Sequence, residues 1–376
     1  MSKLEQLIQE LCPKGVSQYR IDEICDISRG RVMSKDYIRD NAGDYPVYSS
    51  QTENNGELGK ISTYDFDGEY LTWTTDGANA GTVFYRSEKF SITNVCGLIK
   101  IKRENILCKY LYYALNIEAP NYVSSGMGNP KLMSNVMARI KVFVPPLEVQ
   151  REIVRILDNF TELTAELEKE LAERKKQYTY YRDTLLSFET RGYEVSLRDE
   201  TESKRIGALT FYEQPSKYIV KNTNYNDSFD IPVLTAGQSF ILGYTNEKDG
   251  LYRATKEEPV IIFDDFTGAF KWVDFTFKVK SSAMKIIKSN TNLMMLRYLY
   301  YVMGFLNYSS DEHKRLWISK YSNIIIHVPS LETQQKIVDI LDNFAKITEE
   351  LKKEIELTRK QYEYYREKLL DFKEVK

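Results

Sequence analysis

Apolar side chains recur every three or four residues over two long stretches of the chain, and each stretch follows a segment that contains proline. Proline fixes φ and keeps the preceding residue out of the helical region, so Val144-Pro145-Pro146 and Val328-Pro329 are expected to end extended segments. Spacings of three and four that alternate over four heptads are typical of a coiled-coil seam, with charged residues on the other faces. The predicted seam comprises, in order along the chain, Leu157, Phe160, Leu167, Leu171, Tyr178, Tyr181, Leu185, and then Leu341, Phe344, Leu351, Ile355, Tyr362, Tyr365 and Leu369.

The two stretches are copies of one segment. Residues 144–189 and 328–373 align at an offset of 184 without a gap, and 26 of the 46 positions are identical. Repetition of this kind predicts one structural unit present twice. A helix of about 40 residues is roughly 60 Å long at 1.5 Å per residue. Because such a helix cannot bury its apolar stripe alone, we expect it to pack antiparallel against its own repeat. The alternative is a surface helix that joins two chains.

The segments between the predicted helices repeat more faintly. Residues 109–113 return as 297–301 at an offset of 188, and residues 45–47 return as 231–233 at an offset of 186. Short strands followed by a helix indicate a small α+β domain in each half. In the first half the strands are predicted at 45–49, 70–74, 82–85, 90–93 and 97–101, with a helix at 104–116. In the second half they are predicted at 231–235, 259–263, 271–279 and 283–288, with a helix at 291–306.

The expected fold class is therefore α+β, with two small mixed α/β domains separated by two long antiparallel coiled-coil helices in a pseudo-twofold repeat. The expected boundaries are 1–143 for the first globular domain, 144–189 for the first helix, 190–327 for the second globular domain and 328–376 for the second helix. The polar residues 190–204 are expected to link the first helix to the second globular domain.

Composition narrows the class of protein. No apolar run approaches the ~18 residues of a membrane span, and the first residues lack a signal-peptide core, so a cytoplasmic protein is expected. The cysteines, Cys12, Cys25, Cys96 and Cys108, form no close metal-type pair and are expected to be reduced thiols. The net charge is −2, with 17 basic and 17 acidic groups in residues 1–143 and 18 and 16 in residues 190–327. This balance is compatible with DNA binding and does not demonstrate it.

Catalytic and metal-binding motifs are missing from the sequence. It contains no Gly-rich phosphate loop and no Asn/Asp-Pro-Pro-aromatic methyltransferase signature. His313 and His327 are too few for a His-based metal or nucleophile site. Asp264, Asp265 and Lys271 lack the spacing and the preceding Pro-Asp of a nuclease cluster. The chain is therefore expected to be no enzyme and to hold no metal or cofactor of its own.

Two globular modules with a common frame and different details are typical of a recognition protein. Over essentially its whole length the chain resembles the specificity subunit of type I restriction–modification systems. The resemblance depends on Pro-Pro-Leu-Glu-x-Gln at 145–150, Pro-Ser-Leu-Glu-x-Gln at 329–334, and Ile-Val-x-Ile-Leu-Asp at 153–158 and 337–342. Residues 15–30, 126–132, 161–167 and 215–220 are also similar to that family. The second half departs from the pattern because it lacks the Gly-Val…Arg-Gly opening of the first.

The resemblance implies a non-catalytic DNA-binding subunit in which each globular part is a target-recognition domain. Each domain would read one half of a bipartite, asymmetric site in double-stranded DNA, and the helices would set the spacing. The resemblance also implies two methyltransferase subunits and further restriction subunits as partners, which would bind S-adenosylmethionine, ATP and Mg²⁺. The competing interpretation is a coiled-coil scaffold or dimerisation protein whose globular domains bind protein or glycan. Divergent globular parts beside closely matched helices favour two modules for different targets. A self-sufficient DNA enzyme is a third alternative, disfavoured by the missing motifs.

Candidate DNA contacts are polar residues in the predicted loops, because base edges are read by hydrogen-bonding side chains. In the first module the candidates are Ser49, Ser50, Gln51, Asn54, Asn55, Thr74, Thr75, Asp76, Asn79, Asn129 and Lys131, with Arg29 and Arg31 for phosphates. In the second they are Thr235, Gln238, Asp264, Asp265, Thr267, Lys271, Lys314, Arg315 and Trp317. The alternative is that these residues occupy solvated loops, and that the aspartates support a lysine or an arginine.

Overall fold

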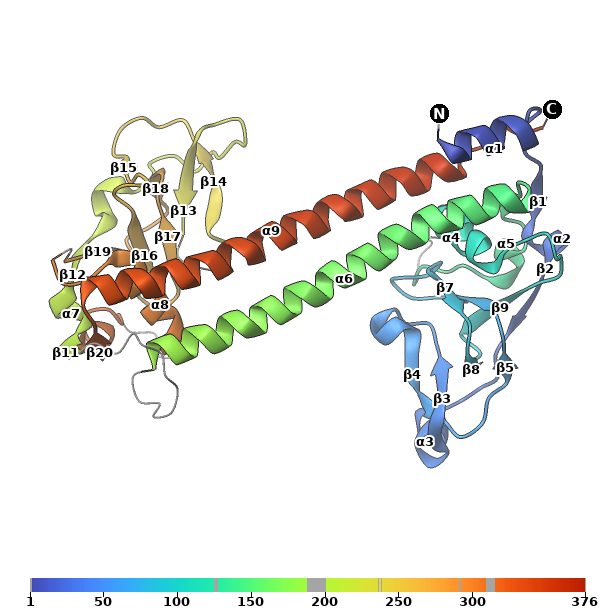
Figure 1. Ribbon diagram of the computed structural model, residues 1–376, viewed down its shortest axis with the longest axis horizontal. Coiled ribbons are helices and arrows are strands. Elements are labelled where there is room, and N and C mark those ends of the chain that lie inside the picture. The colour runs from blue at the N-terminus through green and yellow to red at the C-terminus, as the bar shows by residue number, and fades with distance from the viewer. Residues whose placement is uncertain are drawn as a thin grey trace. The chain divides into compact units, whose positions relative to one another are not determined.

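Two compact units divide the chain, and two 40-residue helices, α6 (Leu147–Leu186) and α9 (Leu331–Leu370), contribute to both. The first unit comprises Met1–Glu168 and Lys353–Lys376, and the second comprises Lys169–Lys352. The computed structural model describes residues 2–124, 128–187, 201–235, 237, 239–290, 292–308 and 315–375 (Figure 1). No helix within these ranges is both long and apolar enough to cross a lipid bilayer.

The described residues of the first unit form three sheets. A two-stranded sheet pairs β1 (Gln18–Arg20) with β10 (Lys141–Phe143). A four-stranded sheet has the order β2 (Cys25–Arg29), β9 (Cys96–Ile101), β6 (Tyr70–Thr74) and β7 (Val83–Arg86). Another has the order β4 (Glu57–Ile61), β3 (Ala42–Tyr48), β8 (Lys89–Ile92) and β5 (Phe66–Asp67). The helices are α1 (Lys3–Leu11), α2 (Ile21–Ile24), α3 (Lys35–Asp40), η1 (Glu53–Gly56), α4 (Cys108–Glu118), η2 (Ala119–Tyr122) and α5 (Ser134–Met137).

The second unit repeats this strand order. A two-stranded sheet pairs β11 (Glu202–Arg205) with β20 (Ile325–Val328). A four-stranded sheet has the order β12 (Thr210–Glu213), β19 (Met284–Ser289), β16 (Val260–Asp264) and β17 (Phe270–Val273). Another has the order β14 (Ile241–Thr245), β13 (Ile231–Leu234), β18 (Thr276–Val279) and β15 (Tyr252–Arg253). Its helices are α7 (Ile206–Leu209), η3 (Pro215–Tyr218), α8 (Leu296–Leu306) and η4 (Tyr321–Asn323). The pairing is parallel between β3 and β8 and again between β13 and β18. The internal repeat and the α+β fold class are confirmed.

The main core of the first unit lies between the sheet that contains β6 and β9 and the helix α4. Leu71, Trp73 and Ile99 of the sheet are fully buried in one cluster with Leu111 and Leu115 of α4. Trp73 also donates from Nε1 to the Leu132 carbonyl at 2.9 Å, which satisfies its polar atom in the core. A Cβ at Gly97 would lie 2.2 Å from the Trp73 ring, so glycine allows the indole to lie against β9.

The long helices pack together within each unit through equivalent aromatic pairs. In the first unit Phe160 stacks on Tyr365 with ring centroids 5.5 Å apart, and in the second Tyr181 stacks on Phe344 at 5.1 Å. In the first unit Arg359 also forms an ion pair with Glu168. Residue numbers therefore rise along α6 while those of their contacts fall along α9, which confirms antiparallel pairing of the helix with its repeat.

The predicted seam residues differ in exposure. Those that are buried are Leu157, Leu167, Leu185, Leu341, Leu351 and Ile355. Those that are partly buried are Phe160, Leu171, Tyr178, Phe344, Tyr362 and Leu369. Tyr181 and Tyr365 are 43% and 39% exposed although their rings stack in the seam. Each tyrosine therefore covers part of the seam and leaves part of its ring on the surface.

Three local predictions were wrong in their extent. The single strand predicted at 271–279 is two strands, β17 and β18, because the chain passes there from one four-stranded sheet to the other. The predicted helices at 104–116 and 291–306 begin later, at Cys108 and Leu296. The last residues of the predicted linker at 190–204 belong to β11, which pairs with β20 as β1 pairs with β10. Residues 190–200 of that linker lie outside the described residues.

Candidate nucleic-acid interface

The predicted contact residues of the first unit lie in three loops that hydrogen-bond to one another. Ser50 Oγ accepts a hydrogen bond from the Thr75 amide at 2.9 Å and donates to the Val95 carbonyl. Thr93 Oγ1 donates to Ser49 Oγ at 3.0 Å. Asn79 Nδ2 donates to Thr52 Oγ1 at 2.8 Å. The structure therefore brings the loops around residues 49–56, 74–82 and 93–96 together as one surface region.

Several of these candidates use their polar atoms inside the protein. Thr74 and Thr75 are buried, and their hydroxyls donate to the carbonyls of Asn79 at 2.5 Å and of Val95 at 2.7 Å. Gln51 donates to the Glu57 carbonyl at 2.5 Å. These side chains fix the shape of the loops because each one donates to a loop carbonyl that would otherwise lack that hydrogen bond. Asp76 is half-buried and accepts from the Thr75 hydroxyl at 3.2 Å.

The candidates with free functional groups are fewer. Asn54, Asn55, Asn129 and Lys131 are exposed, and their side chains make no hydrogen bond or ion pair with any residue that the structure describes. Main-chain bonds hold the Lys131 segment beside the loops, since the Leu132 amide donates to the Thr75 carbonyl at 2.9 Å. These four residues are accessible polar candidates of the first unit's loop region.

The two predicted phosphate contacts are engaged within the protein. Arg29 donates from Nε to Ser134 Oγ at 3.1 Å and from Nη1 to the Asn94 carbonyl at 3.3 Å. Arg31 donates from Nε to Asp65 at 3.0 Å, and the Arg31 side chain is 43% exposed. Both guanidinium groups therefore carry their charge at the surface with part of their hydrogen-bonding capacity already used.

In the second unit, two of the candidates are structural. Asp265 and Lys285 are each 2% exposed and form an ion pair at 3.3 Å. Asp265 Oδ1 also accepts from the Trp317 amide at 2.9 Å, and the Asp265 carbonyl accepts from the Leu316 amide at 2.8 Å. Trp317 is 1% exposed and stacks on Tyr321 at 5.7 Å. Asp265 therefore supports Lys285, which is the alternative role expected for these aspartates.

The other candidates of the second unit lie nearer the surface. Asp264 accepts from the amides of Phe266 and Thr267 at 2.8 and 3.0 Å and so closes the turn that follows β16. Thr235 donates to the Ser239 carbonyl at 2.8 Å. Lys271 is half-buried and Arg315 is exposed. Gln238 and Lys314 lie outside the described residues.

A partly buried joint attaches each globular part to its long helix, and sequence reasoning missed its role. In the first unit the Asp158 carboxylate accepts from Tyr113 and Lys109, both at 2.6 Å. In the second unit Asp342 accepts from Arg297 at 2.7 Å and from the Tyr301 hydroxyl. The repeated Leu-Asp of the helix motif and the repeated Tyr-Leu-Tyr-Tyr motif are thus the two sides of one contact. The available signal was that both motifs recur together.

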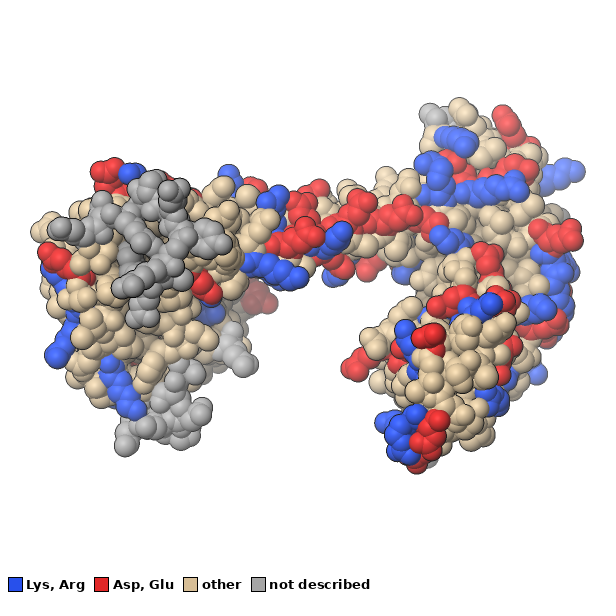
Figure 2. All heavy atoms as spheres, turned by 60° about the horizontal axis from the view of Figure 1, so that its bottom comes forward, with Lys and Arg blue, Asp and Glu red and all other residues tan. Residues whose placement is uncertain are grey.

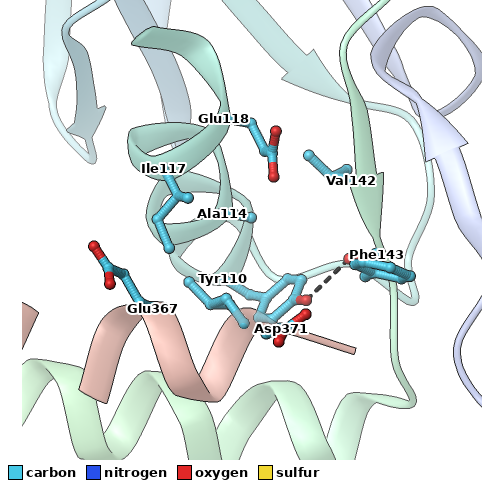
Figure 3. A pocket seen from close by; sticks show the side chains of 9 residues that line it. Tyr110, Ala114, Ile117, Glu118, Val142, Phe143, Glu367 and Asp371 are labelled. Carbon is cyan, nitrogen blue, oxygen red and sulfur yellow. Dashed lines mark hydrogen bonds between the residues drawn. The ribbon is translucent and has the colours of Figure 1, made fainter. Parts of the chain in front are cut away.

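A pocket of the first unit has wall residues that are not repeated at the equivalent positions of the second unit. In the first unit it lies between α4, β10 and the end of α9, and Tyr110 donates across its floor to the Phe143 carbonyl at 2.9 Å (Figure 3). Its wall includes the carboxylates of Glu118, Glu367 and Asp371. The corresponding residues of the second unit, at the offsets of 188 and 184, are Leu306, Asp183 and Ser187. The contacts of the joint are therefore repeated more closely than the residues of this pocket wall.

The described His, Cys, Asp and Glu side chains contain no group of three or more that could hold a metal ion. Burial raises the pKa of the Cys25, Cys96 and Cys108 thiols to about 12, so these thiols stay protonated. Figure 2 shows lysine and arginine interspersed with aspartate and glutamate over the visible face of each unit. Recognition by such a surface depends on local loops more than on a large field of one sign.

Comparison with known proteins gives consistent results. The family model described as the type I restriction modification DNA specificity domain matches residues 13–175 and again residues 199–357. A putative type I specificity subunit of Mycoplasma pneumoniae is 36% identical over 368 residues, which are 95% of this chain and 98% of that protein. The specificity subunit of a type I restriction enzyme of Escherichia coli is 52% identical over 185 residues, which are 46% of each chain.

Solved structures agree on the fold. The crystal structure of a type I restriction-modification S subunit from M. genitalium has a TM-score of 0.67 at 15% identity and covers 94% of this chain and 96% of its own. A structure from work on complex assembly and conformational transition of a type I restriction–modification system has a TM-score of 0.56 at 14% identity, with 95% and 98% covered.

Proposed function

The chain belongs to the family of type I restriction–modification DNA specificity subunits, and from this premise we propose that its two units read two different half-sites of one bipartite DNA target. As a specificity subunit it recognises the DNA target within a restriction–modification complex and is not the catalytic component. The catalytic cofactors of such a complex belong to its methyltransferase and restriction subunits. Membership of this family also decides against the scaffold interpretation.

The observation that carries the proposal is one strand order with two different sets of loops. β3 and β13 hold the same place in their sheets, as do β6 and β16, yet the residues that follow these strands differ between the units. Ser49, Ser50 and Gln51 follow β3, whereas Thr235 follows β13. Loops that vary on a constant frame are the usual place of binding specificity. The proposed target-recognition domains are residues 1–143 and 190–327.

We assign the spacing between the half-sites to the helices of residues 144–189 and 328–376. Half-sites one turn of B-DNA apart are about 34 Å from one another and lie on the same face of the duplex. A fixed spacing needs stiff connections between each domain and its helix. The contacts of Asp158 with Tyr113 and of Asp342 with Tyr301 supply such connections, because they are short charge-assisted hydrogen bonds at partly buried positions.

Two methyltransferase subunits are the proposed partners of the helix pair, with restriction subunits joining the complex. Exposed tyrosines recur at equivalent places on the two helices. Tyr180 and Tyr364 are 54% and 59% exposed, and each packs edge-on against the next tyrosine along the chain. Because the same apolar patch is present twice, it suits two copies of one partner.

The test uses the chain in complex with a type I methyltransferase subunit. The complex is incubated with random-sequence duplex DNA and S-adenosylmethionine, and methylated bases are mapped by single-molecule sequencing. We expect a split motif, with two short half-sites around a spacer of fixed length. Replacing residues 1–143 by the corresponding part of a relative is expected to change one half-site and leave the other. An unsplit motif, or methylation unaffected by the replacement, would contradict the proposal.

A further inference from the structure

An unusual turn lies among the loops of the first unit. Asn54, Asn55 and Gly56 have successive positive φ angles of 53°, 54° and 81°. Left-handed backbone is strained for a residue with a side chain, although asparagine tolerates it better than most. Two successive asparagines in this conformation therefore need support from the surrounding structure to persist.

The support comes from Arg86 at the end of β7. Its side chain is 1% exposed, and Nη2 donates to the Asn55 carbonyl at 2.8 Å while Nε donates to Thr72 Oγ1 at 3.2 Å. The guanidinium carbon lies 3.4 Å from the centre of the Tyr48 ring. Arg86 thus hydrogen-bonds to the turn and to β6 while its guanidinium lies over a tyrosine ring of β3.

The same guanidinium is left incompletely paired. Its Nη1 has no hydrogen-bond partner in the described part of the chain, and no described carboxylate lies within ion-pair distance of it. Burying a charge without a counter-ion is costly, so a purely structural need would be met more cheaply by an apolar side chain. The buried arginine therefore calls for an explanation beyond packing.

The second unit shows that the frame does not require this arginine. Arg86 pairs with the first residue of β6, and the residue that pairs with the first residue of β16 is Val273. Leu234 of β13 stands where Tyr48 stands in β3. One copy of the frame thus uses a valine and a leucine at the two positions where the other copy holds a guanidinium over a tyrosine ring.

Gly56 is fitted to the same contact. A Cβ at this glycine would lie 3.1 Å from Arg86 Nη2 and 3.2 Å from the Gln51 carbonyl oxygen. A side chain there would push the guanidinium away from the turn, and it would also oppose the positive φ. The glycine and the arginine together fix where the two asparagines stand.

We propose that Arg86 is a positioning residue for base recognition, which holds the 54–56 turn so that the free amides of Asn54 and Asn55 read bases of one half-site. Both asparagine side chains are exposed and make no hydrogen bond to a described residue. An asparagine amide can donate and accept at the same time, which matches the N6 and N7 edge of adenine in the major groove. This inference rests on the proposed function and adds to it the residues that determine one half of the target.

The experiment compares variants in the complete complex with the methyltransferase subunit, on the random duplex library. Asn54→Ala and Asn55→Ala remove the proposed contacts at exposed positions. Arg86→Met removes the hydrogen bonds to the turn, and Arg86→Lys keeps the charge but cannot reach the turn and Thr72 together. Leu71→Ala is the matched control, because Leu71 is fully buried in the neighbouring strand and carries no polar group. Base preference at each position of the motif is the readout.

We expect the asparagine and arginine variants to lose base preference at one half-site by about ten-fold or more, the usual size of one lost bidentate contact. The other half-site is expected to stay as in the wild type. Leu71→Ala is expected to lower the yield of methylated DNA with an unchanged motif. Amide hydrogen exchange of residues 54–56 is expected to accelerate in Arg86→Met and to stay as in the wild type in Leu71→Ala.

Two results would overturn the inference. If the wild type shows a split motif and the two asparagine variants keep its base preference at both half-sites, the inference fails while the proposed function stands. If the wild type shows no split motif, both fail together. Should Arg86→Met not fold, the asparagine variants and Gly56→Ala, which displaces the turn without removing the charge, decide the question.

Discussion

Gln150 and Gln334 are equivalent residues that make the same three hydrogen bonds in the two units. Gln150 donates to the carbonyls of Pro145 and Asn105 at 2.7 and 2.9 Å and accepts from the Leu107 amide at 2.9 Å. Gln334 donates to the carbonyls of Pro329 and Leu293 at 2.9 and 3.0 Å and accepts from the Met295 amide at 2.8 Å. Each amide ties the start of a long helix to the residues just before α4 or α8. The repeated Leu-Glu-x-Gln motif is therefore a joint between helix and globular part.

Replacing either glutamine by alanine is expected to destabilise its own unit. Both side chains are fully buried, so Gln150→Ala would leave the Leu107 amide and two carbonyls without partners. The expected loss is about 3 kcal/mol or more in the free energy of unfolding, since each of the three unsatisfied groups costs roughly 1–3 kcal/mol. Denaturant titration would measure this loss of unfolding free energy, and amide hydrogen exchange would show in which unit the loss occurs. Gln335→Ala is the control, because Gln335 is exposed and bonds only to Asp339 on the same helix face. An equal loss of stability in Gln150→Ala and Gln335→Ala would contradict the role of Gln150 as a joint between helix and globular part.

The acid stability of the first unit is expected to depend on Glu152. This carboxylate is 4% exposed and accepts from Arg155 Nη2 at 2.6 Å and from Lys3 Nζ at 3.0 Å, which lowers its pKa to about 2. Since the pKa in the folded state lies below the ordinary value of 4.5, the stabilisation is present above pH 4.5 and is lost as the pH falls towards 2. Its size is expected to be on the order of 1–2 kcal/mol, because both cationic partners are solvent-exposed.

The measurement is the free energy of unfolding of the wild type and of Glu152→Gln between pH 6 and pH 2.5. The difference between the two proteins is expected to be largest near pH 6 and to shrink steadily below pH 4.5. Glu148→Gln is the matched control on the same helix, where the carboxylate is 57% exposed and lies 4.0 Å from Arg151. A difference for Glu152→Gln that is independent of pH would show that its ion pairs contribute nothing through charge.

The buried ion pair of the second unit is expected to behave as a coupled pair. Asp265→Ala would leave the charge of Lys285 without its carboxylate in a site that is 2% exposed, and it would also free the Trp317 amide. A loss of about 3–5 kcal/mol in unfolding free energy is expected. The double variant Asp265→Leu with Lys285→Met is expected to be more stable than Asp265→Ala alone, because no uncompensated charge remains. Thermal denaturation of the three proteins tests this. A double variant that is less stable than the single one would contradict it.

The repeat and the long helices could be predicted from the sequence because the patterns that indicate them are local and periodic. The positions of Leu157 and Leu341 in the seam follow from spacing alone, and the match of 26 positions at one offset shows the duplication without any knowledge of contacts. The strand at 70–74 was also predicted with the bounds that it has. The break between β17 and β18 was not readable, because both halves of 271–279 have strand-like composition. What separates them is that they pair with different sheets, which is a non-local property.

The sequence predicted the loops of the candidate site but not which of their side chains are accessible. Thr74 and Thr75 have the same residue types as loop contacts, but they point inward and close the loops on themselves. Asp265 and Trp317 are buried in the second unit although their polar or amphipathic side chains are typical of surfaces. Arg86 was missed because a buried arginine cannot be told from an exposed one by its neighbours in sequence. Burial of a polar residue depends on partners from distant strands, and a single sequence does not name them.

The stacked pair of Phe160 with Tyr365 offers a test of how the long helices pair. A double-mutant cycle with alanine at both positions is expected to give a coupling energy of about 0.5–1.5 kcal/mol, and the cycle of Tyr181 with Phe344 is expected to give a similar value. The two contacts are equivalent because Phe344 and Tyr365 are the repeats of Phe160 and Tyr181 at the offset of 184.

The mixed cycle of Phe160 with Tyr181 separates the two arrangements that the sequence allowed. If the helix pairs with its own repeat inside one chain, these residues belong to different contacts and their effects on unfolding should add. If α6 instead paired antiparallel with α6 of a second chain, the same register would set Phe160 against Tyr181 of that chain. A coupling energy would then appear in the mixed cycle, and it would depend on protein concentration. Additive effects in the mixed cycle, beside clear coupling in the other two, are the result that pairing within the chain requires.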